Sequence, residues 1–151
     1  MSFGGSRQLP RTLTKEEVRR LLRQAQVACE LEEPPAPGEL DRAFLALRNR
    51  ALLDLLLATG IRIGEAASLH VDSLTLQDGS LKVKGKGRRA RLAYVVDPRS
   101  LGLQEAYLGY RLQVDTDTSS LFLNVFGTSL STQGMANALT ALRRAAGIQR
   151  N

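Results

Sequence analysis

The chain has 151 residues, of which 43% are hydrophobic and 24% are charged, a length and composition that suit one globular domain and exclude wholesale disorder. Lys and Arg outnumber Asp and Glu by 21 to 15, and the net charge of +6 favours an anionic partner such as nucleic acid. A single cysteine, Cys29, and a single histidine, His70, exclude an intramolecular disulfide and the usual cysteine or histidine metal clusters. On charge alone, a basic protein without a nucleic-acid partner is an equal alternative.

No segment of the sequence has the length and polarity of a membrane anchor. The most apolar stretch, residues 51–58, is far shorter than the roughly 20 residues that a membrane helix needs. The N-terminus has no apolar signal core. We therefore expect a cytoplasmic protein without a membrane partner, and we expect residues 1–10 to be a flexible leader or linker.

The first predicted helix begins after Thr14 and ends near Cys29. Thr14 and Glu17 have the spacing of a capping box. Apolar residues then recur at helical spacing on one face, namely Val18, Leu21, Leu22 and Ala25. An acidic, proline-rich stretch at residues 32–39 cannot continue the helix.

A longer helix is predicted from about residue 40 to Thr59. Its second half is apolar almost all round, which is typical of a central core helix. Gly60 is the expected terminator, because glycine adopts the left-handed conformation without steric cost. A short helix is predicted over residues 63–69.

After this helix the apolar period changes to that of strands. Leu74 and Leu76 alternate, Asp78 and Gly79 predict a hairpin turn, and residues 80–86 and 90–96 complete three antiparallel strands. Asp97 and Pro98 open another helix, whose expected apolar residues are Leu101, Leu103, Ala106, Leu108 and Leu112. A short extended stretch over residues 121–126 precedes a last helix, capped by Ser131 and ended by Gly147. The order predicts an α+β fold, mostly α-helical, with a small three-stranded antiparallel sheet.

The second hairpin is strongly basic. Residues 82–91 hold six cations, and Lys82, Lys84 and Lys86 share one face at strand spacing, while Leu81 and Val83 face a core. One interpretation is a solvated sheet edge that lysines protect from aggregation. The other is a hairpin laid against a phosphate backbone, with Lys86 presented between two glycines that allow close approach.

Arg62 follows Gly60 at the start of the predicted short helix. Its guanidinium offers a rigid fork that matches two phosphate oxygens, and the helix N-terminus adds partial positive charge. Glu65, three residues on, can pair with Arg62 and fix its rotamer. Taken alone, the pair is better described as a surface ion pair worth about 0.5 kcal/mol.

Together these motifs resemble a known family. The stretch "LLLATGIRIGEAASLHVDSL", followed by "VKGKGRRARLAYVV", resembles the first half of the catalytic domain of tyrosine recombinases, the phage-integrase and XerC/XerD-like family. A leucine-rich helix, a Thr-Gly turn leading to an arginine, and a Gly-Lys-Gly hairpin occur there in this order. The resemblance covers residues 8–149.

The resemblance implies roles for individual residues. It makes Arg62 the first catalytic arginine, which clamps the scissile phosphate, Lys86 the lysine that protonates the departing 5′ oxygen, and Glu65 a support for Arg62. It implies double-stranded DNA as partner and neither metal nor cofactor, because a protein tyrosine stores the bond energy as a phosphotyrosyl link. The remaining basic hairpin residues become phosphate contacts: Lys82, Lys84, Arg88, Arg89 and Arg91.

The resemblance also has a gap. The family's His-x-x-Arg segment, a second His or Trp and the tyrosine nucleophile are expected after Ile148, and three residues follow it. The tyrosines of this chain, Tyr94, Tyr107 and Tyr110, precede that place and are interpreted as packing residues. We therefore expect residues 11–149 to be the N-terminal part of the catalytic domain, truncated before these motifs, with no nucleophile. Such a fragment would bind DNA as a monomer without cleaving it, whereas the parent would be a tetramer on DNA.

The main alternative is a winged-helix-like DNA-binding regulator without catalysis. Residues 63–69 would be its recognition helix and residues 81–91 its wing. Ala66, Ala67 and Ser68 count against it, because base-reading side chains are usually long and polar.

Overall fold

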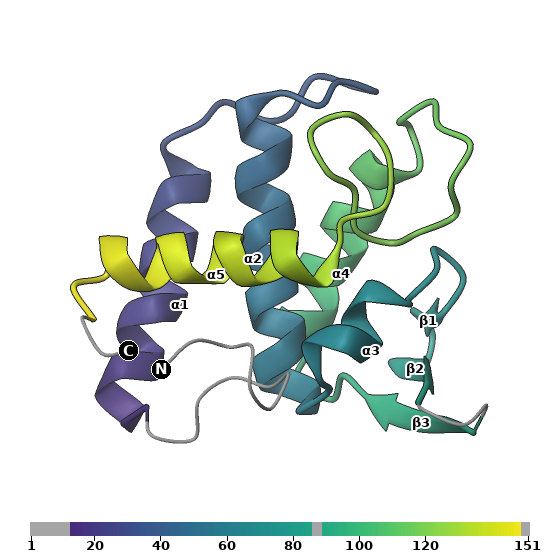
Figure 1. The fold of residues 1–151 in the computed structure, drawn as a ribbon, viewed down its shortest axis with the longest axis horizontal. Coiled ribbons are helices and arrows are strands. Elements are labelled where there is room, and N and C mark those ends of the chain that lie inside the picture. Colours follow the sequence, from purple (N-terminus) through teal and green to yellow (C-terminus); the bar gives the residue numbers. More distant parts are fainter. Residues whose placement is uncertain (1–12, 86–88, 149–151) are drawn as a thin grey trace.

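The computed structural model describes residues 13–85 and 89–148, so the expected leader at residues 1–10 lies outside the described residues. The helices are α1 (Lys15–Glu30), α2 (Arg42–Thr59), α3 (Ile63–Ala67), α4 (Pro98–Arg111) and α5 (Thr132–Ala145), and the strands are β1 (Leu74–Thr75), β2 (Ser80–Lys84) and β3 (Ala90–Tyr94). Figure 1 shows α1 and α2 side by side, with α5 crossing in front of them and the sheet beside α3 at one end. The predicted α+β class with one small sheet is confirmed.

The predicted helix ends are confirmed where local capping decides them. The Glu17 amide donates to Thr14 Oγ1 at 3.1 Å and the Thr14 amide donates to Glu17 Oε1 at 2.9 Å, which completes the capping box before α1. Gly60 follows α2 with φ at 72°, the left-handed conformation that suits glycine. Both ends follow from residues within a few positions of the boundary.

Helix α2 is the centre of the core, as its sequence predicted. It packs against α1 and α4, and α5 also contacts it. Its second half is buried on nearly all sides through Ala51, Leu52, Leu53, Leu55 and Leu56. Within residues 13–85 and 89–148, no helix has the length and apolarity to span a membrane.

An aromatic stack joins α2 and α4 to the segment before α5. The Tyr107 ring lies 5.6 Å from that of Phe44 and 5.4 Å from that of Phe122, measured between centroids. Tyr107 is fully buried, and its hydroxyl donates to the Leu121 carbonyl at 2.8 Å. The stack thereby fixes residues 121–122, which lie outside any regular ladder.

The apolar residues expected on α4 are buried only in part: Leu108 is buried, Leu101 and Leu103 are partly buried, and Ala106 is exposed. The predicted Leu112 is 59% exposed, whereas the residues that α4 buries are Ser100, Gln104, Tyr107, Leu108 and Arg111. Gln104 and Arg111 are tolerated there because backbone carbonyls satisfy them. Gln104 Nε2 donates to the Ala51 carbonyl at 2.9 Å, and Arg111 Nε donates to that of Ser120 at 2.8 Å.

The extended stretch predicted over residues 121–126 forms no strand. It forms an isolated antiparallel β-bridge between Leu123 and Ser129. The Asn124 side chain organises the turn between them, because its Oδ1 accepts from the amides of Phe126 and Thr128. Backbone bonds from the Asn124 amide to the Thr128 carbonyl and from the Leu130 amide to the Phe122 carbonyl cross the same turn, so backbone and side-chain bonds hold it together.

The sheet has the predicted antiparallel order β1-β2-β3. The predicted turn at Asp78 and Gly79 is confirmed, because Gly79 has φ at 72° and the Ser80 amide donates to Asp78 Oδ1 at 2.9 Å. Leu81 and Val83 are fully buried on the inner face. The alternating Lys82 and Lys84 are exposed.

Tyr94 was interpreted as a packing residue, and this is wrong, because it lies exposed on β3, and Leu92 and Val96 are exposed as well. The three residues are 50%, 55% and 83% exposed. Strand alternation places Ala93 and Val95 inward instead, and both are buried. The apolar face of β3 that points outward therefore covers nothing in the described part of the chain.

Asp54 is the one acidic residue of α2, and its burial predicts that the stability of the fold depends on pH. Its Oδ2 is buried without a hydrogen-bond partner, and burial raises the pKa of Asp54 more than the Ser100 hydroxyl and Arg50 lower it. The pKa of Asp54 is therefore higher in the folded protein than in the unfolded one. Its contribution to the free energy of unfolding is fully present below the unfolded pKa, and it is lost as the pH rises through the folded pKa.

We therefore expect Asp54→Asn to raise the free energy of unfolding by about 1 kcal/mol near neutral pH. The gain should shrink towards zero at acidic pH, where the aspartic acid is neutral as well. Urea unfolding of both proteins at the two pH values measures this difference. An equal gain at both pH values would contradict the role of ionisation.

Candidate active site

Arg62 lies at the junction between α2 and α3. Its backbone is extended, with φ at −83° and ψ at 156°, and it occupies the N-cap position of α3. Its neighbours Ile61 and Ile63 are 2% and 1% exposed, so two buried side chains fix the backbone while the arginine points outward. Between described residues, no hydrogen bond or ion pair uses the Arg62 guanidinium.

Glu65 supports the backbone of Arg62 rather than its guanidinium. Its Oε1 accepts from the Arg62 amide at 2.9 Å and from Arg91 Nη2 at 3.0 Å. The side chain of Glu65 is 15% exposed, and that of Arg91 is 50% exposed. The ion pair that the spacing of Arg62 and Glu65 suggested is thus replaced by one between Glu65 and Arg91.

The Glu65–Arg91 contact joins α3 to the basic hairpin. A Cβ placed on Gly85 would lie 3.8 Å from Glu65 Oε2, so the end of β2 also abuts this carboxylate. The Gly85 amide donates to the Arg89 carbonyl at 2.9 Å, which closes the described part of the hairpin. Lys86 and Arg88, both assigned to the site from the sequence, lie outside the described residues.

The other predicted phosphate contacts lie on different sides of the sheet. Lys82 and Lys84 are exposed on the outer face, and Arg89 is exposed at the end of the hairpin. Arg91 lies opposite Val83 on the inner face, where it reaches Glu65. Residues two positions apart in a strand lie on the same face, and Ala93 is an inward residue. This alternation is the sequence signal that could have placed Arg91 on the inner face.

The tyrosines that the structure describes give no nucleophile beside Arg62. Burial, the largest effect, raises the pKa of Tyr107 far above its usual range despite the nearby Arg48 and Arg111, so its phenol stays protonated. Tyr94 lies on the outer face of β3, and Tyr110 is partly buried on α4. Among residues 13–85 and 89–148, no three His, Cys, Asp or Glu side chains form a metal-binding group.

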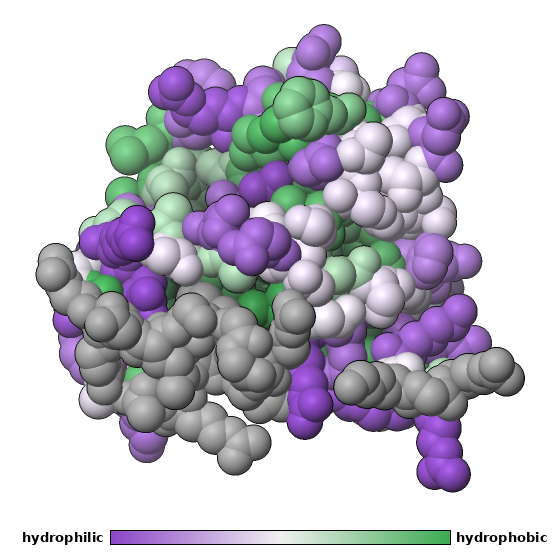
Figure 2. All heavy atoms as spheres, in the orientation of Figure 1, coloured by the Kyte–Doolittle hydropathy of each residue, from purple (hydrophilic) through white to green (hydrophobic). Residues whose placement is uncertain are grey.

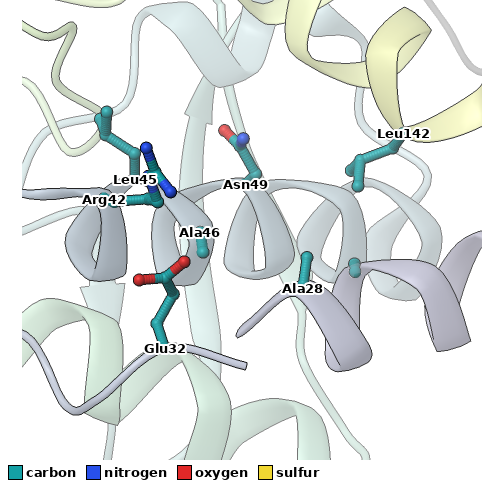
Figure 3. A pocket seen from close by; sticks show the side chains of 8 residues that line it. Ala28, Glu32, Arg42, Leu45, Ala46, Asn49 and Leu142 are labelled. Atoms are coloured by element: carbon teal, nitrogen blue, oxygen red, sulfur yellow. The ribbon is translucent and has the colours of Figure 1, made fainter. Parts of the chain in front are cut away.

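A groove elsewhere on the molecule is not part of this site. It has a volume of about 290 Å³ and lies between α1, α2 and α5. Figure 3 shows Glu32 and Arg42 near one end and Leu142 near the other. The remaining lining residues are mostly apolar, namely Ala25, Ala28, Leu45, Ala46 and Asn49. None of them belongs to α3 or the hairpin.

The sequence as a whole identifies the family. A model described as "Phage integrase family" matches residues 11–151. The chain belongs to the phage integrase family. Among its relatives, tyrosine recombinase XerD of Mycobacterium tuberculosis is 38% identical over 148 residues, which cover 95% of this chain and 44% of that protein. Tyrosine recombinase XerC of Lactobacillus leichmannii is 30% identical, with 95% and 45% covered.

Solved integrase-family structures share the fold. XerA recombinase superposes with a TM-score of 0.75 at 24% identity, covering 94% of this chain and 45% of that one. XerH recombinase bound to its difH substrate gives a TM-score of 0.71 at 25% identity, covering 95% and 39%. This phage integrase family chain thus spans less than half the length of the relatives it matches.

The ion pair with Glu65 changes what we expect of one hairpin arginine in this integrase-family chain. Removing a cation that binds one DNA phosphate lowers the salt dependence of binding by about one unit of slope. We expect Lys84→Gln to do this and Arg91→Gln to leave the slope unchanged, because Glu65 already neutralises Arg91. Fluorescence anisotropy with a duplex at several salt concentrations measures both slopes. An equal decrease in slope for the two variants would place Arg91 on phosphate.

Proposed function

We propose that this chain acts in site-specific DNA recombination, as the phosphate-binding part of a tyrosine recombinase active site. The observation that carries the proposal is Arg62, whose backbone is fixed by two buried isoleucines and by Glu65, while its guanidinium has no partner among residues 13–85 and 89–148. A preorganised cation of this kind stabilises the charge that develops on a reacting phosphate. The relatives named tyrosine recombinase XerC and XerD support the reaction class.

In the proposed reaction, Arg62 holds the nonbridging oxygens of the scissile phosphate. A tyrosine that has lost its phenolic proton to solvent attacks phosphorus through its oxygen, the bond from phosphorus to the 5′ oxygen breaks, and the ammonium of Lys86 gives that oxygen its proton. The energy of the broken bond stays in the phosphotyrosyl link, so rejoining needs no cofactor. Residues 11–149 would form the N-terminal part of the catalytic domain.

We propose that the 151 residues alone bind double-stranded DNA without cutting it. Tyr107 is buried and bonded to Leu121, and Tyr94 lies on the sheet face that is turned away from Glu65. Tyr110 is partly buried on α4. Cleavage then needs a tyrosine other than these three. λ integrase has been solved as a tetramer on a Holliday junction, and a complete recombinase with this chain would likewise act as a tetramer on DNA, in the cytoplasm.

The winged-helix alternative has little support from α3. This helix has five residues and buries Ile63 and Ala66, which leaves few side chains to read bases. The two functions differ in sequence preference. A regulator selects its operator among duplexes, whereas phosphate-led binding tolerates any duplex.

Titration of the chain with several unrelated duplexes tests the proposal. We expect weak binding without sequence preference, which falls steeply as salt rises from about 50 to 200 mM. Replacing Lys82 and Lys84 together by glutamine should lower the salt slope by about two, whereas Lys15→Gln on α1 is the matched control. Affinity that ignores salt would contradict phosphate-led binding.

A further inference from the structure

Among the residues that the structure describes, no strand pairs with the edge of β3 that lies away from β2. The Val95 amide donates to the Gly79 carbonyl at 2.8 Å, and Gly85 bonds Arg89 in the same way. Odd-numbered residues of β3 therefore turn their backbone groups towards β2. The even-numbered residues Ala90, Leu92, Tyr94 and Val96 turn theirs outward, and these groups have no hydrogen-bond partner within the described part of the chain. In Figure 1 no helix or strand lies beyond β3.

The same residues expose apolar side chains. Leu92, Tyr94 and Val96 are 55%, 50% and 83% exposed, and they alternate along one strand, so they share the outer face. Natural sheets usually protect an edge with charges, prolines or bulges. None of these devices lies on the outer face between Ala90 and Val96, so the edge offers both unpaired backbone groups and apolar contact area.

From these features, we propose that β3 pairs antiparallel with β3 of a second copy, which joins two sheets into one. A two-fold axis at Ala93 sets the register. It pairs Leu92 with Tyr94 of the second copy and Ala90 with Val96 of the second copy. Each amide and carbonyl on the unpaired edge of one β3 then faces an amide or carbonyl on the unpaired edge of the other. Leu92 and Tyr94 then pack across the interface on both sides of the axis.

The charges at the ends of β3 fit this antiparallel register. Arg89 precedes the strand and Asp97 follows it, and both are exposed. In the proposed dimer each Arg89 lies opposite Asp97 of the second copy. Lys82 on β2 would be about 14 Å from its counterpart, three strand spacings away, beyond the screening length of about 10 Å. Figure 2 shows hydrophilic residues around this corner, which keep the contact local to the strand.

The proposed pairing replaces the monomer expected from the sequence, and it is tested without DNA. Sedimentation over about a hundredfold range of concentration should show a monomer–dimer equilibrium, because mass action sets the dimer fraction. Leu92→Lys combined with Tyr94→Lys places like charges opposite one another and should weaken association at least tenfold. Phe126→Lys is the matched control, because Phe126 is 85% exposed on a different loop.

Amide hydrogen exchange identifies the edge that pairs. As the dimer forms, exchange should slow at Leu92, Tyr94 and Val96, while Ala93, already bonded to β2, should change little. Arg89→Glu should weaken the dimer through repulsion from Asp97, at unchanged thermal stability of the monomer. A chain that stays monomeric at every concentration overturns the proposal. A dimer that Phe126→Lys dissolves, or one without the alternating protection, also overturns it.

Discussion

Replacing Arg62 with alanine is expected to slow DNA cleavage by about a hundredfold to a thousandfold, the loss found when one charge-stabilising donor is removed. The free energy of unfolding should change by less than about 0.5 kcal/mol, because the side chain is exposed and has no partner between described residues. Arg62→Lys should recover part of the rate, since lysine keeps the charge but lacks the bidentate fork.

A chimeric recombinase makes this measurable. This chain replaces the matching 148 residues of M. tuberculosis XerD, and covalent DNA–protein product is followed over time once the intact chimera is seen to cleave. Arg23→Ala is the matched control, because Arg23 is an exposed arginine on α1. Cleavage by Arg62→Ala at the rate of the control would remove Arg62 from the active site. A fall in stability of several kcal/mol would make it structural.

The elements that the sequence predicted well are those decided locally. Thr14 and Glu17 cap α1, Gly60 ends α2, and Asp78 with Gly79 turns the chain between β1 and β2. In each case the deciding hydrogen bond or backbone angle involves residues at most three positions apart. Such signals do not depend on the rest of the fold.

The polar residues that α4 buries were not predicted, because distant carbonyls decide their burial. Leucines mark one side of this helix, but Gln104 and Arg111 are buried by bonds to Ala51 and Ser120. A polar side chain enters a core once its donors are satisfied. Which carbonyls are within reach depends on how α2 and residues 118–121 pack, and helical periodicity carries no such information.

In the candidate site, too, the sequence predicted the feature that local residues decide and missed the contact that long-range packing decides. The exposed position of Arg62 follows from its place between two apolar residues after Gly60, and the sequence predicted it. The partner of Glu65 did not follow, because Arg91 is 26 positions away and meets it through the packing of the hairpin on α3. The convergence of Lys86 with Arg62 stays a prediction.

Tyr107→Ala is expected to lower the free energy of unfolding by about 3–5 kcal/mol. The substitution removes a fully buried ring from between Phe44 and Phe122 and leaves a cavity. Tyr107→Phe keeps the ring and removes the bond to Leu121, which should cost about 1–1.5 kcal/mol. Urea unfolding measures both, with Tyr94→Ala as the half-exposed control expected within about 0.5 kcal/mol of the parent.

The position of Tyr107 links this stability effect to the candidate site. The Leu121 amide donates to the Leu69 carbonyl, and the Val71 amide donates to that of Ser119, each at 2.9 Å. The stack therefore holds the segment against which the chain leaving α3 is bonded. Tyr107→Ala should weaken DNA binding as well as stability, whereas Tyr107→Phe should leave binding unchanged. If Tyr107→Ala binds DNA as the parent does at a temperature where both are folded, α3 is held without the aromatic stack.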